Sequence, residues 1–294
     1  MSLHHHSEFA LERLLAEREV SVSVCLPARD EAATIGEILD PVLGLAEAGA
    51  VDQVVVVDDS SDATAEIAHA RGAEVHRQCD LRTEAGPVLG KGDAMWRALE
   101  VLRGDVVVYM DCDSRDFGDH FVRGLMGPLA CGGSEAFFVK GFYRRPFDSG
   151  AGGPRPEGGG RVTELTARPL LAAFYPELAS VRQPLAGEIA VRRELLEALP
   201  FTTGYGVDVG LLIDAWERCG IRGLAQVDLD QRQNRHRPLS ELAPMAAAVT
   251  DAIVSRASET GRLAQGRGST ALGELMPRAV VRPSAASLRP AAVV

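Results

Sequence analysis

The sequence predicts an α/β fold with a mostly parallel sheet that helices cover on both faces. Short, continuously apolar segments such as VVVV at 54–57 and VVVYM at 106–110 indicate strands that are buried on both sides. Segments with helical periodicity alternate with them, over 31–39, 62–72 and 92–104. This alternation is typical of βαβ units, in which the strands run parallel.

The remaining elements follow from the same two patterns. The segment VSVSVCLPA at 20–28 indicates a buried strand that ends in a proline-containing loop. The helix expected over 62–72 ends at Gly72, a residue type that commonly closes helices. Further strands are expected over 52–59, 105–111, 135–141 and 223–230, and further helices over 191–200, 208–220 and 239–262.

The composition limits the class of protein. Apolar residues make up 46% of the 294 residues, which indicates a globular chain. With 31 basic against 41 acidic residues the net charge is −10, which argues against a nucleic-acid-binding protein. The longest apolar segments have only strand length, so neither a membrane span nor a membrane partner is expected. Five cysteines without disulfide or metal-binding spacing indicate a reduced, cytoplasmic protein.

Composition also divides the chain into four parts. We expect an N-terminal extension with a helix at 1–18, two halves of the α/β unit at 19–140 and 141–262, and a tail at 263–294. The tail is rich in Ala, Pro and Val from about residue 280 and is expected to be frayed there.

Two segments have unusual composition. His4, His5 and His6 resemble the remnant of an affinity tag and are left out of the site. The Gly- and Pro-rich segment 148–160 is either a mobile loop beside a site or a plain flexible linker.

Polar clusters follow three of the predicted strands. They read PARDE at 27–31, DDSSD at 58–62 and DCDS at 111–114. Because the carboxyl ends of parallel strands meet at one edge of a sheet, where such sheets bind their ligands, we expect a site at this edge.

Asp111 and Asp113 are the strongest candidates within these clusters. Alternate residues of an extended chain point to the same side, so both carboxylates can reach one ligand. Carboxylate oxygens suit Mg²⁺ or Mn²⁺, which complete their shell with phosphate and water. A solvated strand end is the alternative, since the DxD pattern is common in acidic proteins.

Two basic segments are candidates for binding anions. Lys91 lies between two glycines just before a predicted helix, where a phosphate can approach the backbone closely, although the spacing is not that of a Walker A loop. Arg161 and Thr163 follow the glycine-rich segment at the start of another predicted helix, in a locally basic stretch. Exposed side chains with no ligand are the alternative in both cases.

Two further polar residues have open roles. Asp208 begins a predicted helix and is either a favourable charge at a helix N-terminus or an acceptor for sugar hydroxyls. His236 lies in NRHRPL and is either exposed or in contact with a metal or phosphate. The sequence has no Ser/His/Asp triad pattern, so general-base catalysis by histidine is not expected.

Seven motifs together resemble one enzyme family. LPARDEAATI, GKGDAMW, MDCDS, GGRVTELTARPLL, QPLAGE, FTTGYGVDVGLLID and NRHRPL occur in the order found in glucosyl-3-phosphoglycerate synthases and the bacterial mannosyl-3-phosphoglycerate synthases, over about residues 20–245. The resemblance implies a GT-A fold with a Rossmann-like, mixed but mostly parallel sheet. It implies a nucleotide-sugar-binding half at 19–140, an acceptor-binding half at 141–262, and a homodimer.

The resemblance also implies roles for individual residues. The nucleotide-sugar would contact Pro27, Ala28, Arg29, Glu31, Lys91 and Asp111, to which we add Asp58 from the second polar cluster. Asp113 would bind the metal, and Leu185 and Asp208 would lie at the sugar. The acceptor phosphate would bind at Gly160, Arg161, Thr163 and His236.

The sequence departs from the family pattern at two places. Asp208 stands where relatives usually carry Glu, which shortens the reach toward the sugar by one methylene. Relatives read HRNRPL where this chain reads NRHRPL, so either Asn234 or His236 is expected at the metal.

These observations predict a retaining hexosyltransferase. The donor would be GDP-mannose, GDP-glucose or UDP-glucose, the acceptor 3-phosphoglycerate, and the product a precursor of a compatible solute or polysaccharide. The alternatives are an inverting transferase acting on a polyprenyl phosphate, a sugar-nucleotidyltransferase, and a non-catalytic nucleotide-binding module.

Overall fold

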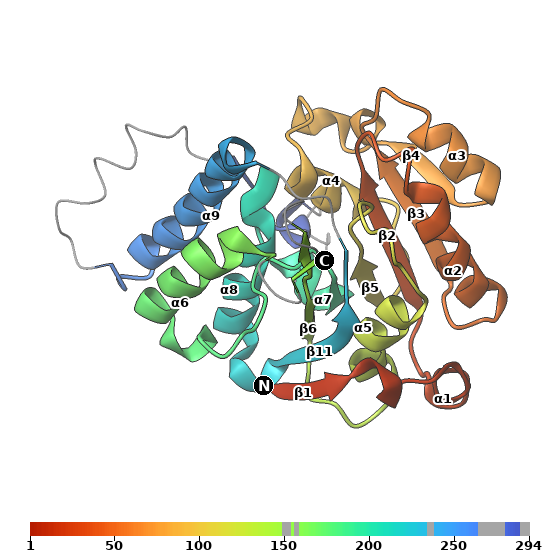
Figure 1. Cartoon of the computed structure of the whole chain (residues 1–294), viewed down its shortest axis with the longest axis horizontal. Coiled ribbons are helices and arrows are strands. Elements are labelled where there is room, and N and C mark those ends of the chain that lie inside the picture. Colours follow the sequence, from red (N-terminus) through yellow and green to blue (C-terminus); the bar gives the residue numbers. More distant parts are fainter. Residues whose placement is uncertain (149–153, 156–158, 234–237, 264–279, 289–294) are drawn as a thin grey trace, which may run out of the picture.

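An eight-stranded mixed sheet forms the centre of the molecule (Figure 1). The computed structural model describes residues 1–148, 154–155, 159–233, 238–263 and 280–288. In spatial order the strands are β1 (Ser2–His5), β11 (Leu224–Gln231), β6 (Phe138–Arg144), β9 (Ile189–Arg192), β5 (Val106–Tyr109), β2 (Val22–Ala28), β3 (Gln53–Asp58) and β4 (Glu74–Arg77).

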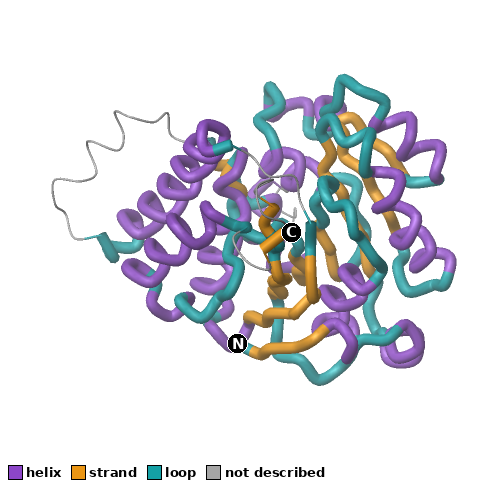
Figure 2. Tube along the Cα trace, in the orientation of Figure 1, coloured by secondary structure: helices purple, strands orange, loops and turns teal. Residues whose placement is uncertain are grey.

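Helices cover both faces of this sheet (Figure 2). One face carries α1 (Leu11–Glu17), α2 (Ile35–Glu47), α3 (Thr64–Arg71) and α5 (His120–Ala130). The other carries α4 (Lys91–Ala98), α6 (Arg168–Phe174), α7 (Arg193–Ala198), α8 (Val207–Cys219) and α9 (Leu239–Glu259).

Alternate side chains of each strand enter the two cores. In β3, Val55 and Val57 pack on the face of α4, whereas Val54 and Val56 pack on the face of α2. This burial on both sides explains the continuously apolar strands of the sequence and confirms the predicted α/β class.

The reversal of one strand shapes the site. Every neighbouring pair in the main sheet is parallel except those made by β9, which runs antiparallel to β5 and β6. Ile189, the first residue of β9, lies opposite Tyr109 of β5 and Lys140 of β6. The segment that leads into β9 therefore lies at the edge where the parallel strands end.

Several elements were not predicted, among them β4, β9 and α5. β4 is short and polar, and β9 has four residues followed directly by a helix, so neither shows a clear pattern of its own. In α5, Gly124, Gly127 and Pro128 interrupt the helical pattern. The prediction of a long helix near 239–262 is confirmed by α9.

The ends of the chain differ from expectation. The supposed tag remnant is part of the main sheet, because β1 pairs with β11 and places His5 opposite Asp228. The prediction of a tail frayed from about 280 is wrong for residues 280–288: β12 (Val281–Arg282) pairs with β10 (Phe201–Thr202), and the indole Nε1 of Trp96 donates to the Pro283 carbonyl at 2.8 Å.

Two other expectations concern the middle of the chain. The boundary expected at residue 140 falls within β6, so the sheet is continuous across it. Most of the expected loop 148–160 lies outside the described residues, and its described parts form a small antiparallel pair, β7 (Phe147–Asp148) with β8 (Pro154–Arg155). No helix in the described part of the chain is long and apolar enough to cross a membrane.

Candidate active site

A cavity of about 590 Å³ opens at the carboxyl edge of the parallel strands. Twelve of the sequence-predicted site residues line it: Pro27, Ala28, Arg29, Glu31, Lys91, Asp111, Asp113, Gly160, Arg161, Thr163, Leu185 and Asp208. The three predicted polar clusters therefore meet in one place, together with the segment after the glycine-rich stretch.

Three predicted residues are not among these twelve. Asn234 and His236 lie outside the described residues, so the expected contact of either one with a metal stays a prediction. Asp58 does not line the cavity, although its neighbour Asp59 does. Asp58 is buried, and its Oδ1 has no hydrogen-bond partner, which makes it a ready acceptor for a ligand N–H.

Lys91 joins two carboxylates across the cavity wall. Its Nζ lies 2.7 Å from Asp111 Oδ1 and 3.2 Å from both carboxylate oxygens of Asp208. Burial opposes the charged form, but Asp111 and Asp208 outweigh it and raise the pKa of Lys91. The ammonium group is therefore charged and fixed in place, as an anionic ligand requires.

The glycines beside Lys91 have specific structural roles. Gly90 has a φ of +83°, which disfavours other residues. A side chain at position 92 would overlap the backbone carbonyl of Thr202. The close approach at Gly92 is therefore made by the protein's own backbone, and the approach of a phosphate to this segment stays a prediction.

Arg232 holds the two acidic residues of the DxD pattern. It is 1% exposed and donates to Asp113 Oδ1 at 2.6 Å, and its Nη1 lies 3.5 Å from Asp111 Oδ2. Burial alone would raise the pKa of Asp111, but Lys91 and Arg232 hold it well below its usual range. Both acidic side chains are therefore held in the cavity wall by positively charged side chains, Lys91 and Arg232.

A buried polar network fixes Arg232 in turn. Its Nη1 forms an ion pair with Glu188 and donates to the Tyr143 hydroxyl at 2.8 Å. The Tyr143 hydroxyl donates in turn to Glu188 Oε2 at 2.7 Å. The Nε of Arg232 donates to Ser114 Oγ at 2.7 Å. Such a satisfied network restricts the guanidinium to one orientation.

Lys140 lies behind Asp208 and does not itself line the cavity. It is 1% exposed, and its Nζ donates to the backbone carbonyl of Asp208 at 3.1 Å. Burial lowers the pKa of Lys140 to about 8, against the pull of Asp208. The sequence contains only two lysines, and both converge on Asp208.

The basic end of the cavity is formed at the start of a helical segment. Gly160 has a φ of +71° and precedes the helical turns that begin at Arg161, so backbone N–H groups point toward the opening. A π-helical stretch, Thr163–Ala167, follows, and such stretches are frequent at functional sites. Arg145 also lines this end, with a buried Nε that has no partner.

The residues at the DxD position fit a divalent cation. Asp111 and Asp113 present carboxylate oxygens side by side on the cavity wall, and hard oxygen donors are those that Mg²⁺ and Mn²⁺ prefer. Asp111 is ionised, as a metal ligand must be.

Sequence reasoning missed four residues of this site: Tyr143, Arg145, Glu188 and Arg232. Arg145 belongs to the basic stretch noted in the sequence, and Arg232 to the basic segment around NRHRPL, so local charge was the available signal. Glu188 ends the QPLAGE motif, but the sequence indicated no role for it, and Tyr143 lies in no motif; both reach Arg232 only in the folded sheet, beside the reversed strand.

Comparisons with known proteins agree with this geometry. Residues 23–148 match the family described as Glycosyl transferase family 2. The chain is 47% identical over 239 residues to the glucosyl-3-phosphoglycerate synthase of Mycolicibacterium paratuberculosis, which covers 80% of this chain and 72% of that protein.

Two solved structures are similar over nearly the whole chain. The crystal structure of mannosyl-3-phosphoglycerate synthase from Rubrobacter xylanophilus matches with a TM-score of 0.87 and 40% identity, covering 98% of each chain. That of glucosyl-3-phosphoglycerate synthase from Mycobacterium tuberculosis, in complex with Mn²⁺, UDP-glucose and phosphoglyceric acid, matches with a TM-score of 0.78 and 41% identity, covering 95% of this chain and 94% of that one.

Proposed function

The chain belongs to the glucosyl- and mannosyl-3-phosphoglycerate synthase family, and on that basis we propose that it transfers a hexose from a nucleotide diphosphate-hexose to the 2-hydroxyl of 3-phosphoglycerate. The proposal includes retention of configuration at the sugar and a divalent cation, Mn²⁺ or Mg²⁺. The relative from Mycobacterium tuberculosis binds Mn²⁺, UDP-glucose and phosphoglyceric acid together.

One observation carries the proposal: a single cavity combines groups suited to a nucleotide diphosphate with groups suited to a small anion. The strand-end segment with Pro27 and Arg29 lines it together with the DxD carboxylates. Arg145, Arg161 and Thr163 line the same cavity. Lys91 pairs with both Asp111 and Asp208, and we infer that the transferred sugar sits beside this pair.

The chain's own residues would assist departure of the diphosphate. Lys91 and Arg232 supply fixed positive charge beside the leaving group, and their ion pairs keep them oriented before the donor binds. A cation held by Asp111 and Asp113 would neutralise charge that develops on the departing diphosphate.

The basic end would orient the acceptor. The Arg145 and Arg161 guanidinium groups and the helix start can hold the phosphate and carboxylate of 3-phosphoglycerate. Holding both anionic groups directs the 2-hydroxyl toward the sugar, which is an orientation effect.

The bond changes balance without a protein nucleophile. The bond between the anomeric carbon and the diphosphate oxygen breaks, and a bond to the acceptor 2-oxygen forms on the same face. The hydroxyl proton passes to the departing phosphate oxygen. This route needs no side-chain base, which accords with a described cavity lining that contains no histidine.

The direct test is a donor panel. Enzyme, 3-phosphoglycerate and Mn²⁺ are incubated with UDP-glucose, GDP-glucose or GDP-mannose, and nucleotide release and sugar product are measured. We expect acceptor-dependent release, with a glucose donor used best in view of the 47% identity to a glucosyl enzyme. If none of the three donors gave acceptor-dependent nucleotide release, the proposed function would be rejected.

A matched pair of variants tests the metal role. Asp113→Ala should reduce turnover by about 10²-fold or more, because the cation loses a ligand. Asp40→Ala removes an exposed carboxylate on α2 that does not line the cavity, and should leave turnover unchanged. Near-normal activity of Asp113→Ala would contradict the proposed metal ligand.

We also propose a cytoplasmic location and a homodimer. All five cysteines are free, which accords with a reducing compartment. The dimer rests on the family resemblance alone, and light scattering of the purified chain would test it.

A further inference from the structure

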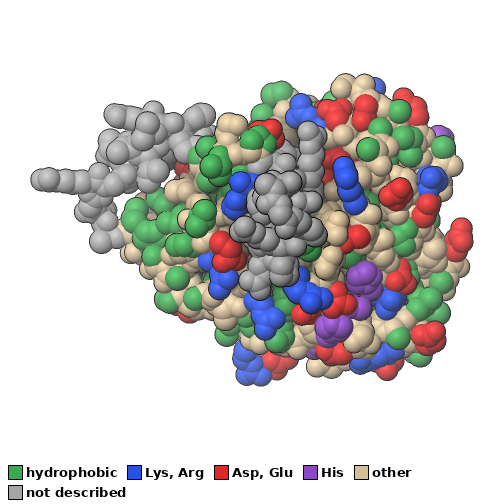
Figure 3. Space-filling model, in the orientation of Figure 1, with side chains coloured by type: hydrophobic (Ala, Val, Ile, Leu, Met, Phe, Trp, Pro, Cys, Tyr) green, Lys and Arg blue, Asp and Glu red, His purple; other side chains and the backbone are tan. Residues whose placement is uncertain are grey.

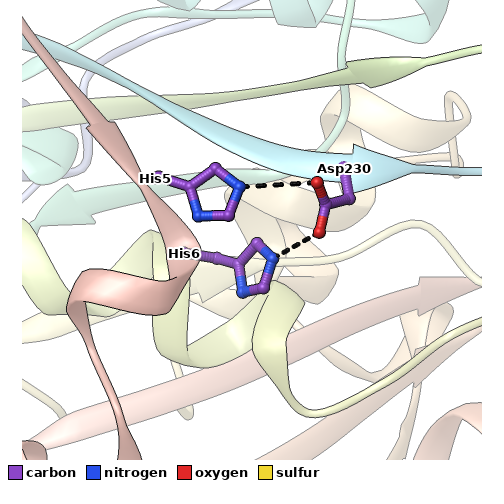
Figure 4. Close-up of side chains that lie close together, drawn as sticks. All are labelled: His5, His6 and Asp230. Carbon is purple, nitrogen blue, oxygen red and sulfur yellow. Dashed lines mark hydrogen bonds and ion pairs between the residues drawn. The ribbon is translucent and has the colours of Figure 1, made fainter.

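A second cluster of ligand-type side chains lies outside the cavity, where β1 meets the end of β11. It consists of His5, His6 and Asp230 (Figure 4). Figure 3 shows histidine side chains at the surface on this face of the molecule, with acidic side chains beside them. None of the three residues lines the cavity of the candidate active site.

The three side chains converge on one point. His6 Nε2 lies 2.7 Å from Asp230 Oδ2, and His5 Nε2 lies 3.4 Å from Asp230 Oδ1. One donor atom from each residue lies within 4.8 Å of the others. An ion with tetrahedral bonds of about 2 Å separates neighbouring donors by about 3.3 Å, so only small side-chain rotations are needed.

The backbone places these side chains before any ion binds. Asp230 has a φ of +65°, at an irregularity in the pairing of β11 with β6. Its N–H donates to Asp228 Oδ1 at 3.0 Å, which stabilises this conformation. His5 is fixed at the end of β1, whose register with β11 puts it opposite Asp228.

The surroundings of His6 also restrict its ring. A side chain at Gly124 of α5 would come within 2.9 Å of His6 Cβ, so only glycine leaves room there. The ring centroid of His120 lies 4.6 Å from that of His6.

We propose that His5, His6 and Asp230 form a binding site for Zn²⁺ that links the N-terminal strand to the end of β11. Two imidazoles and one carboxylate are a preferred ligand set for Zn²⁺, with water in the fourth position. Such a set favours Zn²⁺ over Mg²⁺, which prefers oxygen ligands, so the site differs in kind from the DxD position.

The protons balance without an external base. Each imidazole must offer an unprotonated Nε2 to the ion, so its single proton moves to Nδ1. For His5 this proton can be donated to Ser7 Oγ, which lies 2.7 Å from Nδ1. The N–H of Ser7, now 3.2 Å from the same nitrogen, gives up that contact.

The site also has a structural consequence. Arg232, which holds Asp111 and Asp113, comes two residues after Asp230. A bound ion would therefore brace the end of β11 from outside the cavity and leave the cavity itself unchanged.

The test is metal binding by the full chain. The Asp113→Ala variant, stripped with a chelator, is titrated with Zn²⁺ by calorimetry and with Co²⁺ by visible absorption, in excess Mg²⁺. This background removes one of the two carboxylates proposed to hold the active-site cation. We expect one equivalent of Zn²⁺ to bind, Co²⁺ to give the visible bands of a nitrogen-containing site, and the Tm to rise with Zn²⁺.

Single substitutions identify the ligands. His6→Gln and Asp230→Asn, each in that background, should weaken Zn²⁺ binding at least about tenfold, since loss of even a hydrogen-bond partner of a ligand costs about 10–100-fold. His4→Gln is the matched control. His4 belongs to the same histidine run but bonds Glu8 at 3.1 Å and should leave affinity unchanged.

Three results would overturn the proposal. The first is that Zn²⁺ does not bind in excess Mg²⁺. The second is that Asp230→Asn binds Zn²⁺ with unchanged affinity. The third is that His4→Gln and His6→Gln lose Zn²⁺ affinity equally. The last would mean that a run of histidines chelates the ion without the fold. Circular dichroism of the metal-free variants separates lost binding from lost folding, and His5→Gln provides a third ligand variant if one of the others does not fold.

Discussion

Lys91 is the shared cation of two carboxylates in the cavity wall. Replacing it with methionine leaves Asp111 and Asp208 without their shared cation. We expect Lys91→Met to lower kcat by about 10²–10³-fold, the usual cost of removing one preorganised charge from a developing anion. Steady-state kinetics measures the effect. Arg103→Met, which removes an exposed cation beside Glu74, should have normal kinetics, and equal losses would contradict the role of Lys91.

The lowered pKa of Lys140 leads us to expect that activity falls at alkaline pH. Burial lowers its pKa to about 8, so the free enzyme loses this positive charge beneath Asp208 as the pH rises through 8. Because the donor is anionic, kcat/KM should fall with an apparent pKa near 8. The bound donor favours the charged lysine, so kcat should fall only at higher pH.

The Lys140→Met variant provides the comparison. Its kcat/KM should be lower and should lack the step near pH 8. If the step persisted in the variant, it would belong to another group.

The free energy of unfolding of the unsubstituted protein should rise with pH, whereas its kcat/KM falls. The unfolded chain, with an ordinary lysine pKa of 10.5, binds more protons between pH 8 and 10.5, so stability rises with pH across that window.

The segment that leads into β9 predicts a local steric effect. A side chain at position 187 would overlap the carboxylate of Asp111. We expect Gly187→Ala to displace Asp111 from Lys91 and to reduce kcat by about 10²-fold, since small misplacements of reacting groups are costly. Gly44→Ala in α2 is the control, because nothing lies near its added Cβ. Full activity of Gly187→Ala would show that Asp111 has no fixed catalytic position.

The C-terminal segment supports α4 through one buried carboxylate. Asp93 is fully buried and accepts from Arg97 Nε at 2.8 Å and Arg282 Nε at 2.7 Å. Arg282→Ala should lower the free energy of unfolding by about 1.5–3 kcal/mol, the cost of a charged hydrogen bond at a buried acceptor. Urea unfolding checks this. Arg13→Ala, which removes an exposed pair within α1, should change stability by less than about 0.5 kcal/mol.

At the scale of elements, the strands β2, β3 and β5 were predictable because each is a continuous apolar run of the right length. β9 was not, since its direction depends on pairing with both β5 and β6 and leaves no mark in four residues. The strand β1 was misinterpreted, because a histidine run near a terminus looks like a tag until its pairing with β11 is known.

At the scale of the molecule, some residues of the site could be predicted from the sequence and others could not, depending on how the fold brings them together. Arg29, Lys91, Asp111 and Asp113 were predictable, because parallel strands bring their carboxyl ends to one edge and local motifs mark those ends. The network around Arg232 was not, since Tyr143, Glu188 and Arg232 meet only after the reversed strand is inserted. The carboxylates of the DxD pattern could thus be predicted from the sequence, but the groups that orient them could not.

The pairing of β1 with β11 joins Ser2 to Ala225, about three quarters of the chain apart. In synthesis β1 is therefore made long before the strand with which it pairs. At synthesis rates of about 5–20 residues per second it waits roughly 10–45 s for that partner to be made. A nascent chain that stalls before residue 224 exposes an unpaired strand and lacks the carboxylate at 230, so release of an interrupted product yields a protein with neither its outer edge nor the histidine cluster complete.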